Sequence, residues 1–390
     1  MIADRMKNLH PYEPGEQPKD REYIKLNANE NPYSPSPKVT KEIIKSSKKY
    51  SQRLSLYPDP DSRELKRAIA DMLNKTGGVL CRAECKGRKK SGSGAEVSPS
   101  QFDKLPFNVT EEMIYAGNGS DEVLSFIFYA FFDGNKELIV PEHSYSFYPV
   151  YAGFYQIPLN KVSLNTDWTL DKAKMVEAAK KNNSSIIFAN PNAPTSLGLT
   201  REEIKEMLKN SPKDKVFVVD EAYVDFGGES AIPLLAEFDN LVVVRTFSKS
   251  LCGAGLRLGY AVASPNLIKQ ITIVKNSLNH FPIDYVAQRA GIAACSDVGY
   301  YVECAKTVAF ERDEFIDFLK KQNWHVLESQ TNFVFCKKDG LKGEYCYEQI
   351  KKKGILVRHF KTPGIEDYVR ITIGTNKQMK ELKKIILELK

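Results

Sequence analysis

Two stretches near the middle of the chain, VFVVDEAYVDF at residues 216–226 and LVVVRTFSKSLCGAGLRLGYAVA at residues 241–263, decide the fold. Each contains a run of β-branched residues that is apolar at every position, which is typical of strands buried on both faces. Similar short runs recur at 113–116, 137–140 and 185–190, with helical patterns such as TREEIKEMLKN between several of them. The alternation predicts an α/β fold in which helices cover both faces of a mostly parallel sheet, in three layers.

The chain of 390 residues is longer than a single core usually supports, so we expect a large domain and a smaller α/β domain. Towards the C-terminus the pattern changes to a long helical stretch over roughly 284–322, followed by short strand-like segments and a basic helix. We predict an arm with part of the small domain at 1–54, the large domain at 55–275, and the small C-terminal domain at 276–390. Residues 81–108, rich in Gly, Ser and Lys, are predicted to form a surface insertion in the large domain.

The overall composition argues against several classes of protein. The net charge of +7 is mild, and the lysine runs are not interleaved with aromatic residues, so we expect no nucleic-acid partner. No segment approaches the ~20 apolar residues that span a membrane. The seven cysteines are irregularly spaced and predict reduced thiols in a cytoplasmic protein, and the five histidines show no spacing typical of metal ligands.

The two defining stretches also carry chemistry. Asp220 ends one buried strand, where open α/β sheets bind their ligands, and Tyr223 follows three residues later. Lys249 lies between hydroxyl side chains and before Arg257 in a glycine-rich loop that lacks the Walker pattern. A lone aspartate is more often a helix cap and a lone lysine is weak evidence. Together, however, an amine can form an imine with an aldehyde cofactor and a carboxylate can pair with a pyridinium nitrogen.

A second anion-binding signal lies upstream in AGNGSDEVL, which places Gly119, Ser120 and Asp121 at a strand-to-helix turn. Free backbone N–H groups and the helix dipole favour an anion at such a turn. A simple helix cap by Ser120 explains the same pattern equally well.

The set of motifs resembles the fold-type I pyridoxal-phosphate aminotransferases and, among them, the histidinol-phosphate aminotransferases. The motifs follow the family's order and span nearly the whole chain. They are LNANENPYSPSP (26–37), YPDPDSRELKRAIA (57–70), AGNGSDEVL (116–124), PEHSYSFY (141–148), NPNAPTS (190–196), VVDEAYVDF (218–226), RTFSKSLCGAGLRLGY (245–260) and VRITIGT (369–375).

The resemblance implies a role for each matching residue. Lys249 is implied to be the Schiff-base lysine and proton shuttle, Asp220 the partner of the pyridinium nitrogen, and Tyr223 the donor to the ring's 3′-oxygen. Tyr145 is implied to stack on the ring, although a core tyrosine explains it as well. Tyr57 is implied to reach the cofactor phosphate of a partner subunit, so we expect a homodimer. The implied phosphate ligands are Gly119, Ser120, Thr246, Ser248 and Arg257, with Asp121 adjacent.

One motif departs from the family. Where the family often reads Asn-Pro-Thr-Gly, this chain has Ala193, Pro194, Thr195 and Ser196, so the asparagine expected at the 3′-oxygen is absent. We expect Asn192 to replace it.

The resemblance also implies a substrate. Arg358 and Arg370 match the family's substrate-binding pair, although surface ion pairs are the commoner use of arginine, and Tyr33 in the N-terminal motif could line a lid over the site. The implied reaction converts L-histidinol phosphate and 2-oxoglutarate into imidazole-acetol phosphate and glutamate, a step of histidine biosynthesis. The alternatives are an aromatic amino-acid aminotransferase or a threonine-phosphate decarboxylase. A non-catalytic binding module is disfavoured because Lys249 and Asp220 are both present.

Overall fold

A computed structural model describes residues 2–389 apart from 4, 5, 8, 13, 50 and 82–101. Its large sheet is mostly parallel, which confirms the predicted α/β class: only β8 runs antiparallel to its neighbours in the described sheet. Each apolar run quoted above forms a strand, and β4 is an edge strand that the sequence patterns did not indicate. In spatial order the strands are β2 (Ile114–Gly117), β8 (Gly259–Ala263), β7 (Leu241–Thr246), β6 (Phe217–Asp220), β5 (Ile186–Ala189), β3 (Leu138–Pro141) and β4 (Leu159–Val162).

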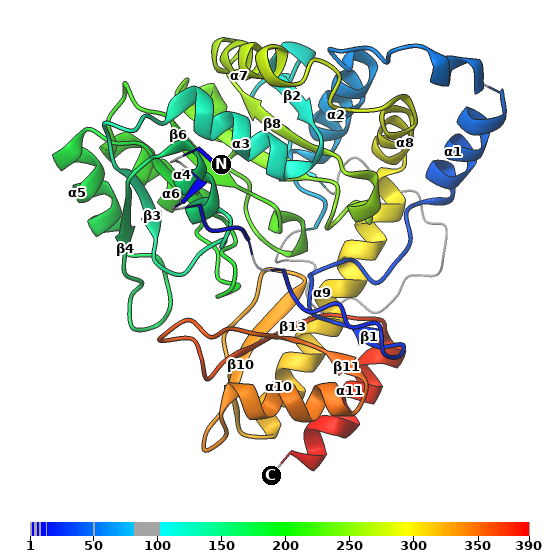
Figure 1. Cartoon of the computed structure of the whole chain (residues 1–390), viewed down its shortest axis with the longest axis vertical. Helices are drawn as coiled ribbons and strands as arrows, with labels where there is room; N and C mark the ends of the chain where they lie inside the picture. Colours follow the sequence, from blue (N-terminus) through cyan, green and yellow to red (C-terminus); the bar gives the residue numbers. More distant parts are fainter. Residues whose placement is uncertain are drawn as a thin grey trace.

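Helices cover both faces of this sheet because successive side chains of each strand point to opposite sides. Val219 and Val243 pack on one side with α2, α5 and α6, while Val218 and Val242 pack on the other side with α3, α4 and α7. These three layers fill the upper part of Figure 1. The helices are α2 (Arg63–Thr76), α3 (Gly119–Phe131), α4 (Tyr148–Tyr155), α5 (Lys172–Asn182), α6 (Arg201–Asn210) and α7 (Pro265–Leu278).

A small antiparallel sheet with strand order β12-β13-β10-β9 forms the second domain, in the lower part of Figure 1. The C-terminal half of α9 packs on it together with α10 and α11. Beside it, the N-terminal strand β1 pairs in parallel with β11, which attaches this part of the arm to the small domain. The elements are β1 (Ile24–Lys25), α9 (Val298–Lys321), β9 (Trp324–Val326), β10 (Phe333–Lys338), α10 (Gly343–Lys352), β11 (Ile355–Leu356), β12 (Arg358–His359), β13 (Val369–Thr372) and α11 (Asn376–Glu388).

The predicted long helix over 284–322 is two helices, α8 (Tyr285–Cys295) and α9, separated at Ser296 and Asp297. Helix α8 and the first turns of α9 bury their apolar side chains in the large-domain core. Helix α1 (Pro37–Lys49) packs on α8 and contributes Val39 to the same core. The large domain therefore includes helices on both sides of the range 55–275 predicted for it.

Most of the predicted insertion, residues 82–101, lies outside the described residues. The described part that follows is attached to the body of the domain, because Phe102, Leu105 and Phe107 are partly buried against the large core. Short 3-10 helices occur at Ser51–Ser55, Glu111–Met113, Val224–Phe226, Ile232–Ala236 and Ala254–Leu256. Within the described ranges, no helix is both long and apolar enough to cross a bilayer.

A buried ion network fastens the carboxyl ends of β6 and β7. Arg245, 3% exposed, donates from Nε to Glu221 at 2.8 Å and from Nη1 to Asp225 at 3.3 Å, and it also bonds the carbonyl of Gly78. Burial raises the pKa of Glu221, and the charge of Arg245 opposes that rise. Asp225 in turn accepts a bond of 2.6 Å from Ser250, so the network reaches the loop that follows β7.

Replacing Arg245 tests this network. Arg245→Met is expected to lower the free energy of unfolding by roughly 3–5 kcal/mol, because Glu221 and Asp225 would remain buried without their cation. The measurement is urea unfolding followed by tryptophan fluorescence. Arg67→Met is the matched control, since Arg67 pairs with Glu111 at the exposed surface, where ion pairs contribute little. Equal losses in the two variants would contradict the assignment.

Candidate active site

Two neighbouring cavities open at the carboxyl ends of the parallel strands. The strand-end cavity, of about 220 Å³, is lined by the last residues of β5, β6 and β7, which are Ala189, Asp220 and Thr246. The interdomain cavity, of about 390 Å³, lies between the large domain, the N-terminal arm and the strands of the small sheet. Both cavities share Lys249 and Tyr223 in their lining, so a ligand in one can contact a ligand in the other.

Asp220 forms the floor of the strand-end cavity. Its carboxylate is 4% exposed and accepts hydrogen bonds from the Tyr148 hydroxyl at 3.0 Å and from the Ala222 N–H at 3.2 Å. Burial raises the pKa of Asp220 to about 6, and the two hydrogen bonds limit that rise. A buried carboxylate of this kind is stabilised by a cation placed beside it, such as a protonated ring nitrogen.

Lys249 lies in the loop after β7 and faces both cavities. Its Nζ donates to the Ala28 carbonyl at 3.2 Å and lies 5.6 Å from the centre of the Tyr223 ring. The Lys249 backbone carbonyl accepts a bond of 2.9 Å from the Asn31 side chain. The amine, the phenol and Asp220 therefore line one cavity, where an amine could react with an aldehyde.

The other end of the strand-end cavity suits a phosphate. Helix α3 begins at Gly119, whose φ of 80° favours glycine, and a Cβ there would lie 2.6 Å from Nη2 of Arg257. Arg257 pairs with Asp121 at 3.1 Å. A helix N-terminus beside a guanidinium group binds anions well. Of the residues predicted at the phosphate, Ser120, Asp121, Thr246, Ser248 and Arg257 line this cavity, whereas Gly119 does not.

Tyr145 lines both cavities. Its hydroxyl donates to Asp121 at 2.9 Å, and its ring meets that of Tyr148 edge-on at 5.5 Å. Burial raises the pKa of Tyr145, so its hydroxyl stays protonated. A flat ligand between Asp220 and Arg257 would lie against this ring.

Asn192 does not line either cavity. Its amide donates to the His143 carbonyl at 2.9 Å and to Thr195 at 3.0 Å, while its carbonyl oxygen accepts from Ser144 at 2.8 Å. The next residue, Ala193, lines both cavities instead.

Two further tyrosines of the prediction lie outside the linings of these cavities. Tyr33 is half-buried between the cores of the two domains. Tyr57 is 82% exposed and stacks on Phe281 with ring centres 4.5 Å apart, so it is available to a neighbouring subunit.

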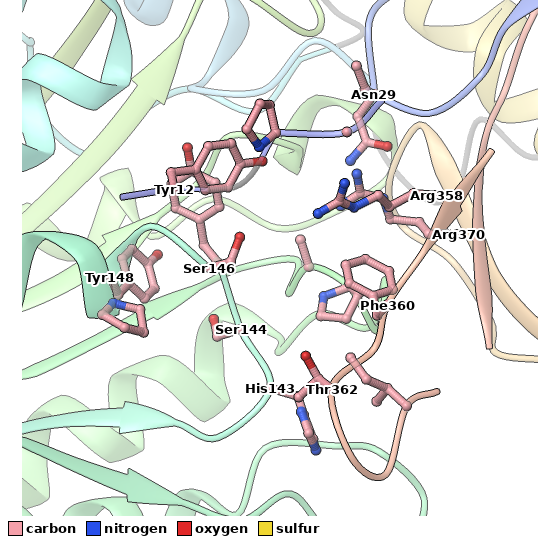
Figure 2. A pocket seen from close by; sticks show the side chains of 18 of the residues that line it. Tyr12, Asn29, His143, Ser144, Ser146, Tyr148, Arg358, Phe360, Thr362 and Arg370 are labelled. Carbon is pink, nitrogen blue, oxygen red and sulfur yellow. The ribbon is translucent and has the colours of Figure 1, made fainter. Parts of the chain in front are cut away.

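Arg358 and Arg370 face the interdomain cavity together. They are register partners on the antiparallel strands β12 and β13, which places both side chains on the same face of the small sheet. Figure 2 shows both guanidinium groups directed into the cavity from the same side. The Arg370 guanidinium lies between the rings of Phe333 and Phe360, 5.3 and 5.5 Å from their centres. Its Nε is buried without a hydrogen-bond partner among the described residues, as suits a group that binds an anionic ligand.

Motif reasoning from the sequence missed two residues of this site. Tyr148, fully buried, bonds Asp220, and the only available signal was its place in PEHSYSFY. Asn29, labelled in Figure 2 above the two arginines, donates to the Tyr223 hydroxyl at 2.9 Å. Its signal was the motif LNANENPYSPSP, from which only Tyr33 was selected. Among the described residues no group of three or more His, Cys, Asp or Glu is placed to hold a metal ion.

Comparison with known proteins agrees with this geometry. The sequence profile described as "Aminotransferase class I and II" matches residues 21–386, so the fold and the site define a class I and II aminotransferase. Proteins named histidinol-phosphate aminotransferase from Syntrophus aciditrophicus (strain SB) and Acinetobacter baylyi are 43% and 41% identical to this chain. The matches cover 98% and 97% of this chain and 96% and 94% of the relatives. The chain belongs to the histidinol-phosphate aminotransferase family.

Solved structures show the same fold. The histidinol-phosphate aminotransferase from Sinorhizobium meliloti, determined in complex with pyridoxal-5'-phosphate, matches with a TM-score of 0.77 and 22% identity over 95% of this chain and 93% of that chain. The enzyme of the same name from Clostridium acetobutylicum matches with a TM-score of 0.76 and 21% identity over 94% and 98%. These likenesses confirm the predicted fold type.

The raised pKa of Asp220 gives a pH-dependent prediction for the cofactor-free protein. Because the folded pKa of about 6 exceeds the ordinary 3.8, the folded protein binds more protons between these values, and stability falls as pH rises through this window. Asp220→Asn removes this fall. The variant is expected to gain up to about 3 kcal/mol over the parent at pH 7.5 and little at pH 4. Urea unfolding at both pH values measures the difference, and a gain independent of pH would contradict the assignment.

Proposed function

We propose that this aminotransferase transfers an amino group between L-histidinol phosphate and 2-oxoglutarate, with glutamate as the donor in the biosynthetic direction. The carrying observation is the pair Arg358 and Arg370 on adjacent strands, directed into the cavity that Lys249 also lines. The names of the relatives support the same substrate. We also infer a cytoplasmic enzyme, supported by the cysteines Cys252, Cys295, Cys304, Cys336 and Cys346, which are buried and form no disulfide with another described residue.

Pyridoxal phosphate fits the strand-end cavity. Asp220 would hold its ring nitrogen, Tyr223 its ring oxygen, and Arg257 with the helix N-terminus of α3 its phosphate. When bound, this cofactor supplies an electron sink for the bonds at the substrate's amino carbon. A cavity of about 220 Å³ between these groups leaves the interdomain cavity for the substrate.

The chain's own groups provide the remaining chemistry. Asp220, ionised beside a ring cation, keeps that nitrogen protonated and electron-withdrawing. The Lys249 amine lies between the two cavities and can carry a proton to and from the substrate. Tyr145 lines both cavities and would contact the ring of the cofactor. Asn192 was expected to replace the missing asparagine at the ring oxygen, but its amide bonds the His143 carbonyl and Thr195 and lies outside both cavity linings, so we assign it no contact with the cofactor.

The two arginines suit a dianionic phosphate better than a single carboxylate. Each guanidinium forms charge-assisted hydrogen bonds worth roughly 1.5–3 kcal/mol, and a phosphate has enough oxygens for both. Burial lowers the pKa of Arg370, although the group remains fully charged near neutral pH, so an anion that replaces its lost water is stabilising. Glutamate, which carries a side-chain carboxylate, can use the same pair in the other half of the reaction.

A comparison of specificity constants tests the substrate. Arg370→Ala is expected to lower kcat/KM for both histidinol phosphate and glutamate by at least about a hundredfold, because both would use that partly buried arginine. Arg358→Ala should affect histidinol phosphate more than glutamate. Steady-state kinetics with 2-oxoglutarate as the amino acceptor measures kcat/KM for histidinol phosphate.

The same assay distinguishes the alternatives. If unphosphorylated histidinol or phenylalanine reacts as well as histidinol phosphate, the phosphate argument fails and an aromatic aminotransferase is indicated. Release of carbon dioxide from threonine phosphate would indicate the decarboxylase.

We further propose a homodimer in which Tyr57 completes the partner's site. The support is that Tyr57 is 82% exposed and lies outside both cavity linings, and that Leu54 and Leu56, just before it in the sequence, are also exposed. Exposed apolar side chains that lie near one another are typical of a protein interface.

Subunit mixing tests the shared site. Tyr57→Ala and Lys249→Ala protomers are each expected to have low activity, and mixing them should restore part of it, because one site of each mixed dimer contains both Tyr57 and Lys249. Activity is measured after verified subunit exchange, with each variant re-exchanged alone as control. A monomer at working concentration, or no recovery, would rule out the shared site.

A further inference from the structure

Residues 27–31 cross between the two domains and bond the predicted reactive groups in turn. The Asn27 carbonyl accepts from Nη2 of Arg370 at 3.2 Å, and the Ala28 carbonyl accepts from Nζ of Lys249 at 3.2 Å. The Asn31 side chain donates to the Lys249 carbonyl at 2.9 Å. One short stretch of the arm therefore contacts both the anion-binding strand and the lysine loop.

Asn29 is at the centre of this stretch and is 1% exposed. Its backbone N–H donates to the Thr372 hydroxyl at 3.0 Å, and that hydroxyl donates back to Oδ1 of Asn29 at 3.1 Å. Its Nδ2 donates to the Tyr223 hydroxyl at 2.9 Å, and its carbonyl accepts from the Asn332 side chain at 2.9 Å. Backbone and side chain of Asn29 are thus held by hydrogen bonds on several sides.

These bonds have a fixed polarity. The Thr372 hydroxyl accepts from the Asn29 N–H and donates its single proton to Oδ1 of Asn29. With Oδ1 turned to Thr372, the amide presents Nδ2 to Tyr223, and an amide nitrogen can only donate. The Tyr223 hydroxyl must therefore accept from Asn29, and its own proton is available only to another acceptor.

Burial makes this polarity effective. Thr372 is 2% exposed and Tyr223 is 8% exposed, so little water competes for the bonds between them. The Tyr223 ring is fixed edge-on against Phe333 at 5.1 Å, and its side chain lines both cavities. The free direction of its hydroxyl proton is accordingly towards a ligand in these cavities.

We propose that Asn29 and Thr372 are positioning residues that make Tyr223 a hydrogen-bond donor to the ring oxygen of the cofactor. The proposal rests on the proposed role of Tyr223 at that oxygen. It adds that the direction of the Tyr223 proton is set by the small domain, because Thr372 belongs to β13, the strand that also carries Arg370. Asn29 and Thr372 would then connect the strand that carries the anion-binding Arg370 to the tyrosine that binds the ring oxygen.

The isosteric change Asn29→Asp tests the polarity. A carboxylate can only accept, so it would attract the Tyr223 proton away from the cavity, whereas Asn29→Ala only releases it. Donation to the ring oxygen favours its anionic form, and losing that donation raises the pH midpoint of the visible absorbance change of bound pyridoxal phosphate. We expect a rise of about one pH unit in Asn29→Asp, a smaller rise in Asn29→Ala, and a fall in kcat of about tenfold in each.

Variants at Thr372 test the orienting bond. Thr372→Val keeps the side-chain shape but removes the hydroxyl, and is expected to raise the midpoint partway. Thr372→Ser restores the hydroxyl and should return the parent midpoint. Asn74→Asp is the structural control, since the Asn74 amide makes a similar bond to the Val109 carbonyl at 2.9 Å on α2. It should lower stability without moving the midpoint.

Tyr223→Phe separates the proposed role of Tyr223 at the ring oxygen from the proposed role of Asn29. If this variant raises the midpoint and the Asn29 variants do not, the Asn29 proposal is overturned while the role of Tyr223 stands. If Tyr223→Phe leaves the midpoint unchanged, the proposed role of Tyr223 fails and the Asn29 proposal fails with it. Equal shifts of the pH midpoint in Asn29→Asp and Asn74→Asp would show a merely structural effect and overturn the Asn29 proposal. Should Asn29→Asp fail to fold, Asn29→Ala and Thr372→Val decide by the same titration.

Discussion

The site depends on a negative charge placed where water does not reach it. Asp220 ends a strand that lies between two parallel neighbours, and helices cover both faces of the sheet, so among the described residues its carboxylate accepts hydrogen bonds only from Tyr148 and the Ala222 N–H. Charge repulsion from Asp121 and Glu221 adds to the effect of burial on its pKa. A buried carboxylate with so few partners favours a cationic ligand over a neutral one, and this selects a protonated ring nitrogen.

The carboxylate of the next residue, Glu221, is also buried but is paired with a cation. Glu221 points to the other side of the strand end, where Arg245, Ser230 and the Ala231 N–H satisfy it. This saturated network continues through Asp225 to Ser250, the residue after Lys249. The two consecutive acidic residues therefore have different roles. Asp220 can pair with a cationic ligand, whereas Glu221 anchors the loop that carries Lys249.

The sequence predicted the strand-based half of the site well and the remainder less well, for physical reasons. Asp220 and Lys249 follow continuous apolar runs, and the ends of neighbouring parallel strands must meet at one sheet edge, so their proximity could be predicted. The break between α8 and α9 was missed because helical periodicity continues across it. Asn192 was predicted to bind the ring oxygen because it is next to position 193, where the family often has asparagine. Its amide instead points to the His143 carbonyl, and Ala193 lines the cavity. Asn29 lies in a motif, but no local pattern separates it from the other asparagines there, because its bonds involve Thr372, 343 residues away.

The large domain carries the cofactor side of the site and the small domain the anion-binding side, and the two differ in how firmly their residues are packed. The groups around the strand-end cavity lie at the ends of buried strands or in the loop after β7, which the buried ion network anchors to the large-domain core. Arg358, by contrast, lies on the two-residue strand β12, and the segment at 27–31 has hardly any regular structure. Substitutions on the small-domain side can therefore change which anion is bound with little effect on the cofactor side. Asn29 is the exception, because its side chain bonds Thr372 on one side and Tyr223 on the other. A change of substrate anion that moved β13 would consequently be transmitted to the tyrosine, which constrains how far that strand can vary.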